Sequence, residues 1–254
     1  MPSPMQNLTE SPCPTAAPGK GAGVRRLFAA IARRYDFANH LLSGGLDFLW
    51  RRRAAAIIKK QQPSRILDVA TGSGDLALAL QKACPNAKVT ATDFCQPMLD
   101  EAARKGLTDL ILADALALPF PDSSYDALTV AFGLRNMEDW SKAIREMARV
   151  IRPGGLLLIL DFSVPPPPLR GIYRFYLHRI MPRIAAIVTG EKTAYDYLAD
   201  SIEAFPSGAN MTTLIETCGL VEANCQRLTG GIVSLYTARK GGGAGPLPLP
   251  TTVD

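Results

Sequence analysis

The stretch that decides the fold is "ILDVATGSGDLAL", residues 66–78. An apolar run that carries Asp68 passes through small residues and continues into a segment rich in leucine and alanine, the pattern of a buried strand, a tight turn and a helix. Gly72 and Gly74 lack a β-carbon, so the backbone there can approach a bound group closely. The following helix offers unpaired N–H groups at its start. The stretch therefore predicts a ligand-binding turn after the first strand of an open α/β sheet.

Strand and helix patterns alternate after this turn. The predicted strands are residues 65–70, 87–93, 109–114, 125–132, 155–163, 220–228 and 231–240. The predicted helices are residues 75–84, 96–106, 139–151 and 207–218, with a helical insert at 169–204 before the last strands. The fifth strand is expected to begin after a turn at Pro153–Gly155. This alternation predicts an α/β fold with a Rossmann-like, mostly parallel sheet.

The composition is that of an ordinary globular protein, with 254 residues, 47% hydrophobic and 20% charged. We predict a disordered N-terminal arm (1–23), a single domain (24–240) that includes N-terminal helices and a helical lid or insert (169–204), and a flexible tail (241–254). No apolar run is long enough to span a membrane, and the first residues lack the order of a signal peptide. The five cysteines are scattered without a CxxC pair, which predicts a cytoplasmic protein without a metal site.

The net charge of +5 is unevenly distributed, with nine arginines and lysines between residues 25 and 60. We interpret this concentration as the solvated faces of two helices. An anionic membrane surface and nucleic acid are the alternatives.

Acidic residues around the glycine turn favour S-adenosylmethionine over a dinucleotide. Asp93 ends the second strand, where a carboxylate can accept both ribose hydroxyls. Ala77 stands where a dinucleotide fingerprint has its third glycine, and Asp75 opens the helix, where it would repel a pyrophosphate but attract a sulfonium and an ammonium. Asp68 adds to that field, unless these two acids only cap the helix and the turn. With Asp114 after the third strand, the pattern predicts a class I S-adenosylmethionine-dependent methyltransferase.

A second polar group follows the fourth strand, in "AFGLRNMEDW", residues 131–140. Arg135 and Asn136 are adjacent there, at the side of the pocket where a methyl acceptor is expected. The alternative is a surface loop with a solvated arginine.

Five longer stretches carry a resemblance: "YDFANHLLSGGLDFLWRR" (35–52), "LDVATGSGD" (67–75), "ADALALPFPDSSYDALTVAFGLRN" (113–136), "RVIRPGGLLLILDFS" (149–163) and "YDYLADSIEAFP" (195–206). From about residue 25 to 240 the chain resembles the ubiquinone and menaquinone biosynthesis C-methyltransferases. The resemblance implies cofactor contacts at Ser73, Asp93, Asp114, Ala115 and Ala131, in addition to Asp68 and the two glycines. Many relatives have serine where this chain has Ala131. Thr71 replaces a glycine, which requires φ below zero at that position.

The function implied by the resemblance is S-adenosylmethionine-dependent C-methylation of demethylmenaquinone, the last step of menaquinone biosynthesis. A ubiquinone or phylloquinone precursor is an alternative acceptor, and an RNA or other small-molecule methyltransferase is a second alternative. We expect Arg135 to stabilise the phenolate that develops on the ring, Asn136 to orient the ring oxygen, and Tyr35 to help hold a water that relays the proton. The two histidines, His40 and His178, are expected to be non-catalytic.

The acceptor implied by the resemblance is a prenylated quinol, which the enzyme must meet at a bilayer. Residues 169–188 interleave Arg170, Arg174, Arg179 and Arg183 with apolar residues, typical of an interfacial helix or of an ordinary amphipathic core helix. We therefore expect a cytoplasmic protein, with peripheral contact at the inner face of the membrane if residues 169–188 form an interfacial helix. No aromatic and basic platform for nucleic acid is present. The sequence does not indicate the oligomeric state.

Overall fold

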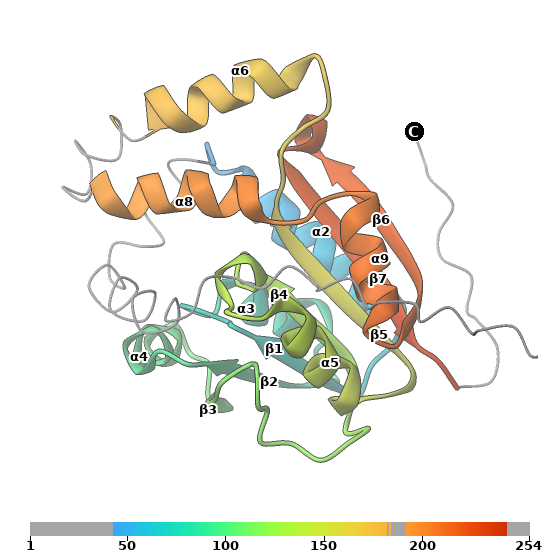
Figure 1. Ribbon diagram of the computed structural model, residues 1–254. Coiled ribbons are helices and arrows are strands. Elements are labelled where there is room, and N and C mark those ends of the chain that lie inside the picture. Colours follow the sequence, from blue (N-terminus) through green and yellow to red (C-terminus); the bar gives the residue numbers. More distant parts are fainter. Residues whose placement is uncertain (1–42, 182, 184–191, 243–254) are drawn as a thin grey trace, which may run out of the picture.

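A seven-stranded sheet forms the centre of the molecule in a computed structural model that describes residues 43–181, 183 and 192–242 (Figure 1). The strands are β1 (Arg65–Val69), β2 (Lys88–Asp93), β3 (Leu110–Leu112), β4 (Tyr125–Ala131), β5 (Ile151–Phe162), β6 (Leu220–Leu228) and β7 (Val233–Lys240). Their order is β3-β2-β1-β4-β5-β7-β6, and β7 runs antiparallel to both of its neighbours. The predicted Rossmann-like, mostly parallel sheet is confirmed.

Helices cover both faces of this sheet (Figure 1). The helices are α2 (Leu46–Lys60), α3 (Asp75–Ala83), α4 (Gln96–Arg104), α5 (Trp140–Val150), α6 (Leu169–Phe175), α8 (Lys192–Ala204) and α9 (Ala209–Thr217), with short turns η1 (Leu134–Asn136), η2 (Tyr176–Ile180) and η3 (Thr229–Gly231). α2 and α3 pack on one face, and α5 and α9 pack on the other. α6 and its continuation η2 pack against α8 beyond the carboxyl end of β5.

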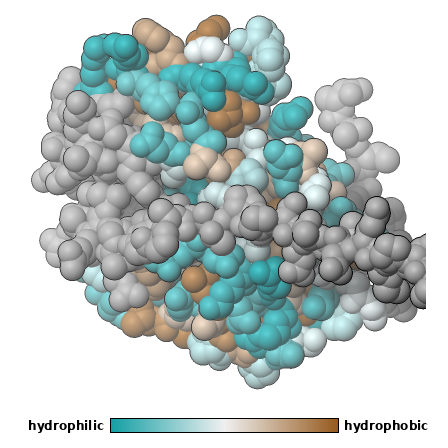
Figure 2. All heavy atoms as spheres, viewed as in Figure 1, coloured by the Kyte–Doolittle hydropathy of each residue, from teal (hydrophilic) through white to brown (hydrophobic). Residues whose placement is uncertain are grey.

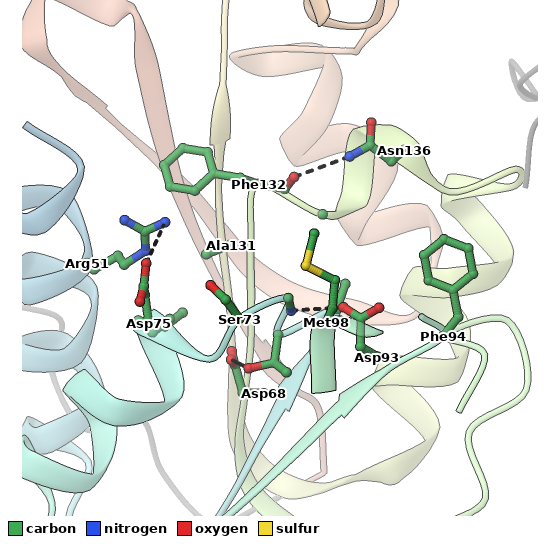
Figure 3. Close-up of a pocket in the computed structure, with 15 residues that line it drawn as sticks. Arg51, Asp68, Ser73, Asp75, Asp93, Phe94, Met98, Ala131, Phe132 and Asn136 are labelled. Atoms are coloured by element: carbon green, nitrogen blue, oxygen red, sulfur yellow. Dashed lines mark hydrogen bonds and ion pairs between the residues drawn. The ribbon is translucent and has the colours of Figure 1, made fainter. Parts of the chain in front are cut away.

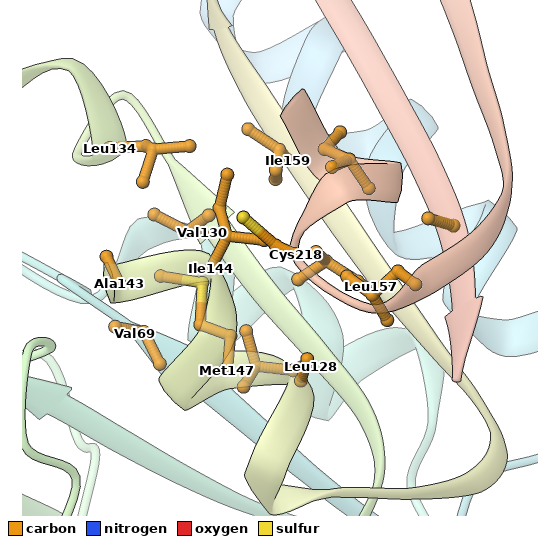
Figure 4. Packing of buried hydrophobic residues seen from close by; sticks show 14 of the residues in the cluster. Val69, Leu128, Val130, Leu134, Ala143, Ile144, Met147, Leu157, Ile159 and Cys218 are labelled. Atoms are coloured by element: carbon orange, nitrogen blue, oxygen red, sulfur yellow. The ribbon is translucent and has the colours of Figure 1, made fainter. Parts of the chain in front are cut away.

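The two core clusters explain why the central strands read as continuous apolar runs. Both faces of β1, β4 and β5 are covered, so neither face of these strands selects polar residues. Figure 4 shows Val69, Leu128 and Leu157 of the three strands packing against Ile144 and Met147 of α5. This buried layer fixes the strand ends, and with them the loops that follow β1, β2 and β4.

The start of the fifth strand differs from the prediction. Residues 153–155, expected to be a turn, lie inside β5. The pairing shifts from Tyr125 with Ile151 to Ala127 with Leu156, so β5 carries three more residues than β4 over this span. The segment is therefore a bulge, which bends the strand without ending it.

Parts of the predicted domain organisation lie outside the described residues. These are the N-terminal arm, the helix expected before residue 43, most of the tail, and the part of the insert that joins the two described helical segments. Among the helices that the structure describes, none has both the length and the hydropathy needed to cross a bilayer.

Candidate active site

A pocket opens where β1, β2 and β4 end, with the loops after these strands and α2 as its walls (Figure 3). We call it the acidic pocket, because Asp68, Asp75 and Asp93 all line it. This is the position at which parallel α/β sheets bind ligands. Of the residues predicted to bind the cofactor, it brings together Asp68, Gly72, Ser73, Asp93 and Ala131.

Asp93, at the end of β2, is fixed by two backbone donors. One carboxylate oxygen accepts from the N–H of Gly72 at 2.8 Å, and the other accepts from the N–H of Cys95 at 2.9 Å. Burial raises the pKa of Asp93 to about 6, and these backbone hydrogen bonds oppose that rise. Each oxygen can accept a further hydrogen bond, so the carboxylate suits the two hydroxyls of a ribose.

Asp68, in β1, is held by two threonine hydroxyls. Thr129 Oγ1 donates to one oxygen at 2.5 Å, and Thr71 Oγ1 donates to the other at 2.6 Å. Burial raises the pKa of Asp68 to about 6, and the two hydroxyls oppose the rise. Thr71 is not among the residues with positive φ, whereas Ala70 and Gly72 on either side of it are, so the backbone condition for threonine is met. Thr71 therefore anchors the carboxylate of Asp68.

The two glycines of the turn do different things. Gly72 has φ 57° and open space around the place of a β-carbon, so it leaves room in the pocket that it lines. Gly74 has φ 85°, and a β-carbon there would lie 2.3 Å from Leu107 Cδ1. Gly74 does not line the pocket, so its position supports packing of α3 and not the predicted cofactor contact, which stays a prediction.

Asp75 contributes less to the acidity of the pocket than the sequence predicts, because two cations lie beside it. Its carboxylate accepts from Lys105 Nζ at 2.6 Å and lies 3.7 Å from Arg51 Nη2. Lys105 also donates to Ser73 Oγ at 3.1 Å. Two cations from α2 and from the end of α4 therefore offset Asp75, and it is Asp68 and Asp93 that make the pocket acidic. These cations are distant in sequence, so the local pattern could not reveal them.

Phe132, directly after β4, is a pocket residue that the sequence analysis missed. Its backbone has φ 57°, a conformation that is strained for a bulky side chain, and its N–H donates to Leu160 O at 2.7 Å. The ring packs on Phe162 at 4.8 Å between centroids and on Trp50 at 6.2 Å. An aromatic residue at the end of a predicted strand, directly before a glycine, was the signal available in "AFGLRN".

Asn136 and Arg135 are placed differently. Asn136 lines the acidic pocket, and its amide Nδ2 donates to Phe132 O at 3.4 Å. Arg135 is buried away from it, with Nη1 donating to the fully buried carboxylate of Asp161 at 2.7 Å and also to Phe132 O. Its guanidinium carbon lies 5.3 Å from the centre of the Phe162 ring. Direct contact between Arg135 and an acceptor oxyanion stays a prediction. The counter-ion of Arg135 is Asp161, which the sequence analysis missed.

The remaining predicted residues lie outside the acidic pocket or outside the described chain. Asp114 is exposed and accepts from the N–H of Leu116 at 2.9 Å, and Ala115 packs against the core. Neither lines the pocket. Tyr35 falls outside the described residues. His178 lies on η2, where Nε2 is 3.3 Å from Glu203.

A second, apolar cavity of about 510 Å³ lies between α2, α6, η2 and α8. Trp50 and Phe162 line it, and both rings pack on Phe132 of the acidic pocket. The two spaces are therefore separated by an aromatic wall. We call the second one the apolar cavity. Its lining residues come from four separate parts of the sequence, within 43–50, 162–181, 198–202 and 229–232, so no single motif indicated it.

Solved structures with the same fold include S-adenosylmethionine-dependent methyltransferases. A structure from Thermotoga maritima, described as a possible histamine N-methyltransferase, superposes with a TM-score of 0.60 at 15% identity, over 85% of this chain and 98% of that one. Human N-acetylserotonin methyltransferase in complex with S-adenosylmethionine superposes with a TM-score of 0.55 at 18% identity, over 85% of this chain and 59% of that one. At these identities the likeness concerns the fold.

Fold, acidic pocket and sequence relatives together define the protein as a class I S-adenosylmethionine-dependent methyltransferase. The model of the ubiE/COQ5 methyltransferase family matches residues 17–240, and the chain belongs to that family. A demethylmenaquinone methyltransferase of Thermus thermophilus is 45% identical over 83% of this chain and 98% of its own length. One from Deinococcus radiodurans is 42% identical over 87% and 94%. The ubiquinone/menaquinone biosynthesis C-methyltransferase of Geobacter sulfurreducens is 40% identical over 87% and 90%.

Proposed function

We propose that the protein transfers the methyl group of S-adenosylmethionine to a ring carbon of demethylmenaquinol, a prenylated naphthohydroquinone. The relatives in Thermus and Deinococcus carry the name of this activity and are matched over nearly their whole length. The observation that carries the proposal is the apolar cavity beside the acidic pocket. An aromatic ring with a long hydrocarbon tail needs such a space, whereas a polar acceptor does not.

In this proposal the reacting ends of the two ligands meet at the aromatic wall, where the acidic pocket and the apolar cavity adjoin. Phe132 lines the acidic pocket, while Trp50 and Phe162 line the apolar cavity on the other side of the same ring cluster. Only the reacting carbon must reach the cosubstrate, so the tail can stay in the apolar cavity. This division suits an acceptor with one reactive ring and one inert chain.

When bound, S-adenosylmethionine would supply an electrophilic methyl group. Its carbon–sulfur bond would break as the carbon–carbon bond to the ring forms, with S-adenosylhomocysteine as the leaving group, and the ring carbon would then lose its proton to a water molecule. Opposite charges on the sulfonium and the ionised quinol disappear in this step, so a water-poor site favours it. The buried side chains of Trp50 and Phe132 exclude water at the wall. In this proposal Asn136, which lines the acidic pocket, hydrogen-bonds the acceptor's ring oxygen through its amide.

Arg135 acts from behind the wall in this scheme. Its guanidinium packs against the ring of Phe162, which lines the apolar cavity. Burial raises the pKa of Tyr173, another residue of that cavity, and the positive charge of Arg135 opposes this rise. Asp161 offsets most of that charge and holds the turn that carries Asn136. We propose that Arg135 positions the turn and contributes electrostatically to oxyanion stability.

The test is methyl transfer by the purified chain to a reduced, prenylated naphthoquinone that lacks the ring methyl, with the product identified by mass spectrometry. Asn136→Ala is expected to lower turnover by a factor on the order of a hundred, because a placed amide donor is lost, while S-adenosylmethionine affinity stays unchanged. Asn210→Ala, an exposed asparagine on α9, is the matched control. Absence of a methylated product from the unmodified chain, under conditions where it binds S-adenosylmethionine, would refute the acceptor assignment. Faster transfer to a benzoquinol precursor would move the assignment to ubiquinone synthesis.

We further propose that α6 contacts an anionic bilayer at the inner face of the membrane. Leu169, Ile172 and Phe175 are 44%, 71% and 60% exposed, and arginines flank them along α6 and η2. Leu169 and Ile172 also line the apolar cavity, so the exposed surface continues into it. Figure 2 shows hydrophobic and hydrophilic residues side by side at the top of the molecule, where α6 lies. This arrangement is typical of an interfacial helix.

Vesicle co-sedimentation tests the membrane contact. Binding is expected with phosphatidylglycerol vesicles, to weaken several-fold in the Ile172→Asn and Phe175→Asn double variant, and to fall with salt. Leu112→Asn, which alters a 54% exposed leucine at the far edge of the sheet, should bind like the unmodified chain. Equal sedimentation of both variants with the unmodified chain would contradict docking through α6.

A further inference from the structure

We infer that Arg51 of α2 binds the carboxylate of the amino-acid end of S-adenosylmethionine. That end of the cosubstrate carries an ammonium, which the acidic pocket suits, and a carboxylate, which Asp68 and Asp93 would repel. Among the described residues that line the pocket, Arg51 is the one with a cationic side chain. Arg51 is therefore the cationic partner that the described lining of the acidic pocket offers to the carboxylate of the cosubstrate.

The direction of the pocket places the amino-acid end near Arg51. Asp93 and Phe94 mark the end of the pocket at β2, where the ribose hydroxyls are expected. Figure 3 shows Arg51 and Asp75 on the opposite side, with Asp68, Ser73 and Ala131 between the two ends. A ligand whose ribose lies at Asp93 and whose chain crosses the end of β1 reaches α2 with its far end.

Arg51 is also held in place for this role. Its side chain is 11% exposed and pairs with Asp47, one turn earlier on α2, which is itself buried and accepts from Ser43 Oγ at 2.7 Å. The guanidinium carbon lies 5.4 Å from the centre of the Phe132 ring. Such fixing lowers the entropy that a long side chain loses on binding a ligand.

One edge of the guanidinium remains suited to a ligand. Nη1 is engaged by Asp47, whereas Nη2 lies 3.7 Å from Asp75, which is longer than a hydrogen bond. Asp75 has Lys105 at 2.6 Å as its nearer partner. A carboxylate from the cosubstrate can therefore take the Nη2 edge without leaving Asp75 unpaired.

Calorimetric titration with two ligands tests the inference. One ligand is S-adenosylhomocysteine, and the other is the same molecule without its carboxylate, which removes the group that Arg51 is inferred to bind. The unmodified chain should bind the complete ligand more tightly, by a factor on the order of ten to a hundred, because a charge-assisted hydrogen-bonded pair contributes that much. In Arg51→Gln this preference should fall close to one. Arg52→Gln, which alters the exposed neighbouring arginine, should keep the full preference.

The ratio between the two ligands separates binding from folding. If Arg51→Gln weakens the binding of both ligands by the same factor, the preference for the complete ligand is unchanged and the inference is overturned. Where Arg51→Gln does not fold, Arg51→Met replaces it and is judged by the same ratio. Failure of the unmodified chain to bind S-adenosylhomocysteine would instead remove the cosubstrate assignment itself.

Discussion

Replacing Asp68 by asparagine should stabilise the free protein while weakening cosubstrate binding. Asp68 is 1% exposed, and burial raises the pKa of its carboxyl group from 3.8 to about 6. A folded-state pKa above the unfolded value means that the group favours the folded state most below pH 4. This contribution is lost as the pH rises through 6, so the ionised carboxylate destabilises the folded protein at neutral pH.

The size of the effect follows from the difference in pKa. Each pKa unit corresponds to about 1.4 kcal/mol, so the ionised Asp68 costs the folded protein about 3 kcal/mol at neutral pH. Asparagine removes this cost but weakens the hydrogen bonds from Thr71 and Thr129, by about 1 kcal/mol each. The net expectation is a gain of about 1 kcal/mol in the free energy of unfolding at neutral pH, which becomes a loss as the pH falls to 4.

Urea unfolding at several pH values measures the change in the free energy of unfolding. Calorimetric titration with S-adenosylmethionine measures the change in affinity. The variant should bind the cosubstrate roughly 30-fold more weakly, because an attraction of about 2 kcal/mol for the ammonium is lost. Asp122→Asn, which alters an exposed carboxylate far from the acidic pocket, controls for the change in net charge. A loss of stability in Asp68→Asn that does not depend on pH would refute the argument.

Three further predictions concern the same site. Gly74→Ala should cost about 3 kcal/mol of unfolding free energy and Gly72→Ala about 1 kcal/mol, because only the first combines positive φ with a clash; equal losses in urea unfolding would contradict this. Asp161→Asn should cost about 3 to 5 kcal/mol, since it leaves the buried charge of Arg135 without its counter-ion, and an unchanged melting temperature would rule out that pairing. Affinity for S-adenosylmethionine should fall between pH 7.5 and 5.5, with protons released on binding, because both buried carboxylates of the acidic pocket have a pKa of about 6; an affinity independent of pH, or calorimetric heats that do not depend on the buffer, would count against it.

Local patterns in the sequence predicted the elements and the acidic pocket for a physical reason. Apolar periodicity and glycine turns act over a few residues, and parallel strands bring their carboxyl ends to one edge of the sheet. Asp68 and Asp93 could therefore be placed together from the sequence. The bulge at residues 153–155 could not, because proline and glycine suit both a bulge and a turn.

Pairings between distant residues were outside the reach of these patterns. Arg135 was identified from its place after β4, but its partner Asp161 lies on the neighbouring strand, 26 residues away. The partners of Asp75 come from α2 and from the end of α4. In each case a charged side chain that the sequence identifies is paired with an oppositely charged side chain that only the folded structure brings close to it. A motif therefore locates a charged residue more reliably than it fixes what that charge does.

The clearest case is α2, where two consecutive residues serve two different spaces. Successive side chains on a helix point about 100° apart, so Trp50 and Arg51 extend into different spaces, although both also contact the ring of Phe132. Trp50 lines the apolar cavity and donates from Nε1 to Thr229 Oγ1 at 2.9 Å, while Arg51 lines the acidic pocket. The letters "WR" give no sign of this, because it depends on how α2 docks on the sheet. Since one rigid helix contributes to both walls, a shift of α2 that disturbs the acidic pocket must also disturb the apolar cavity.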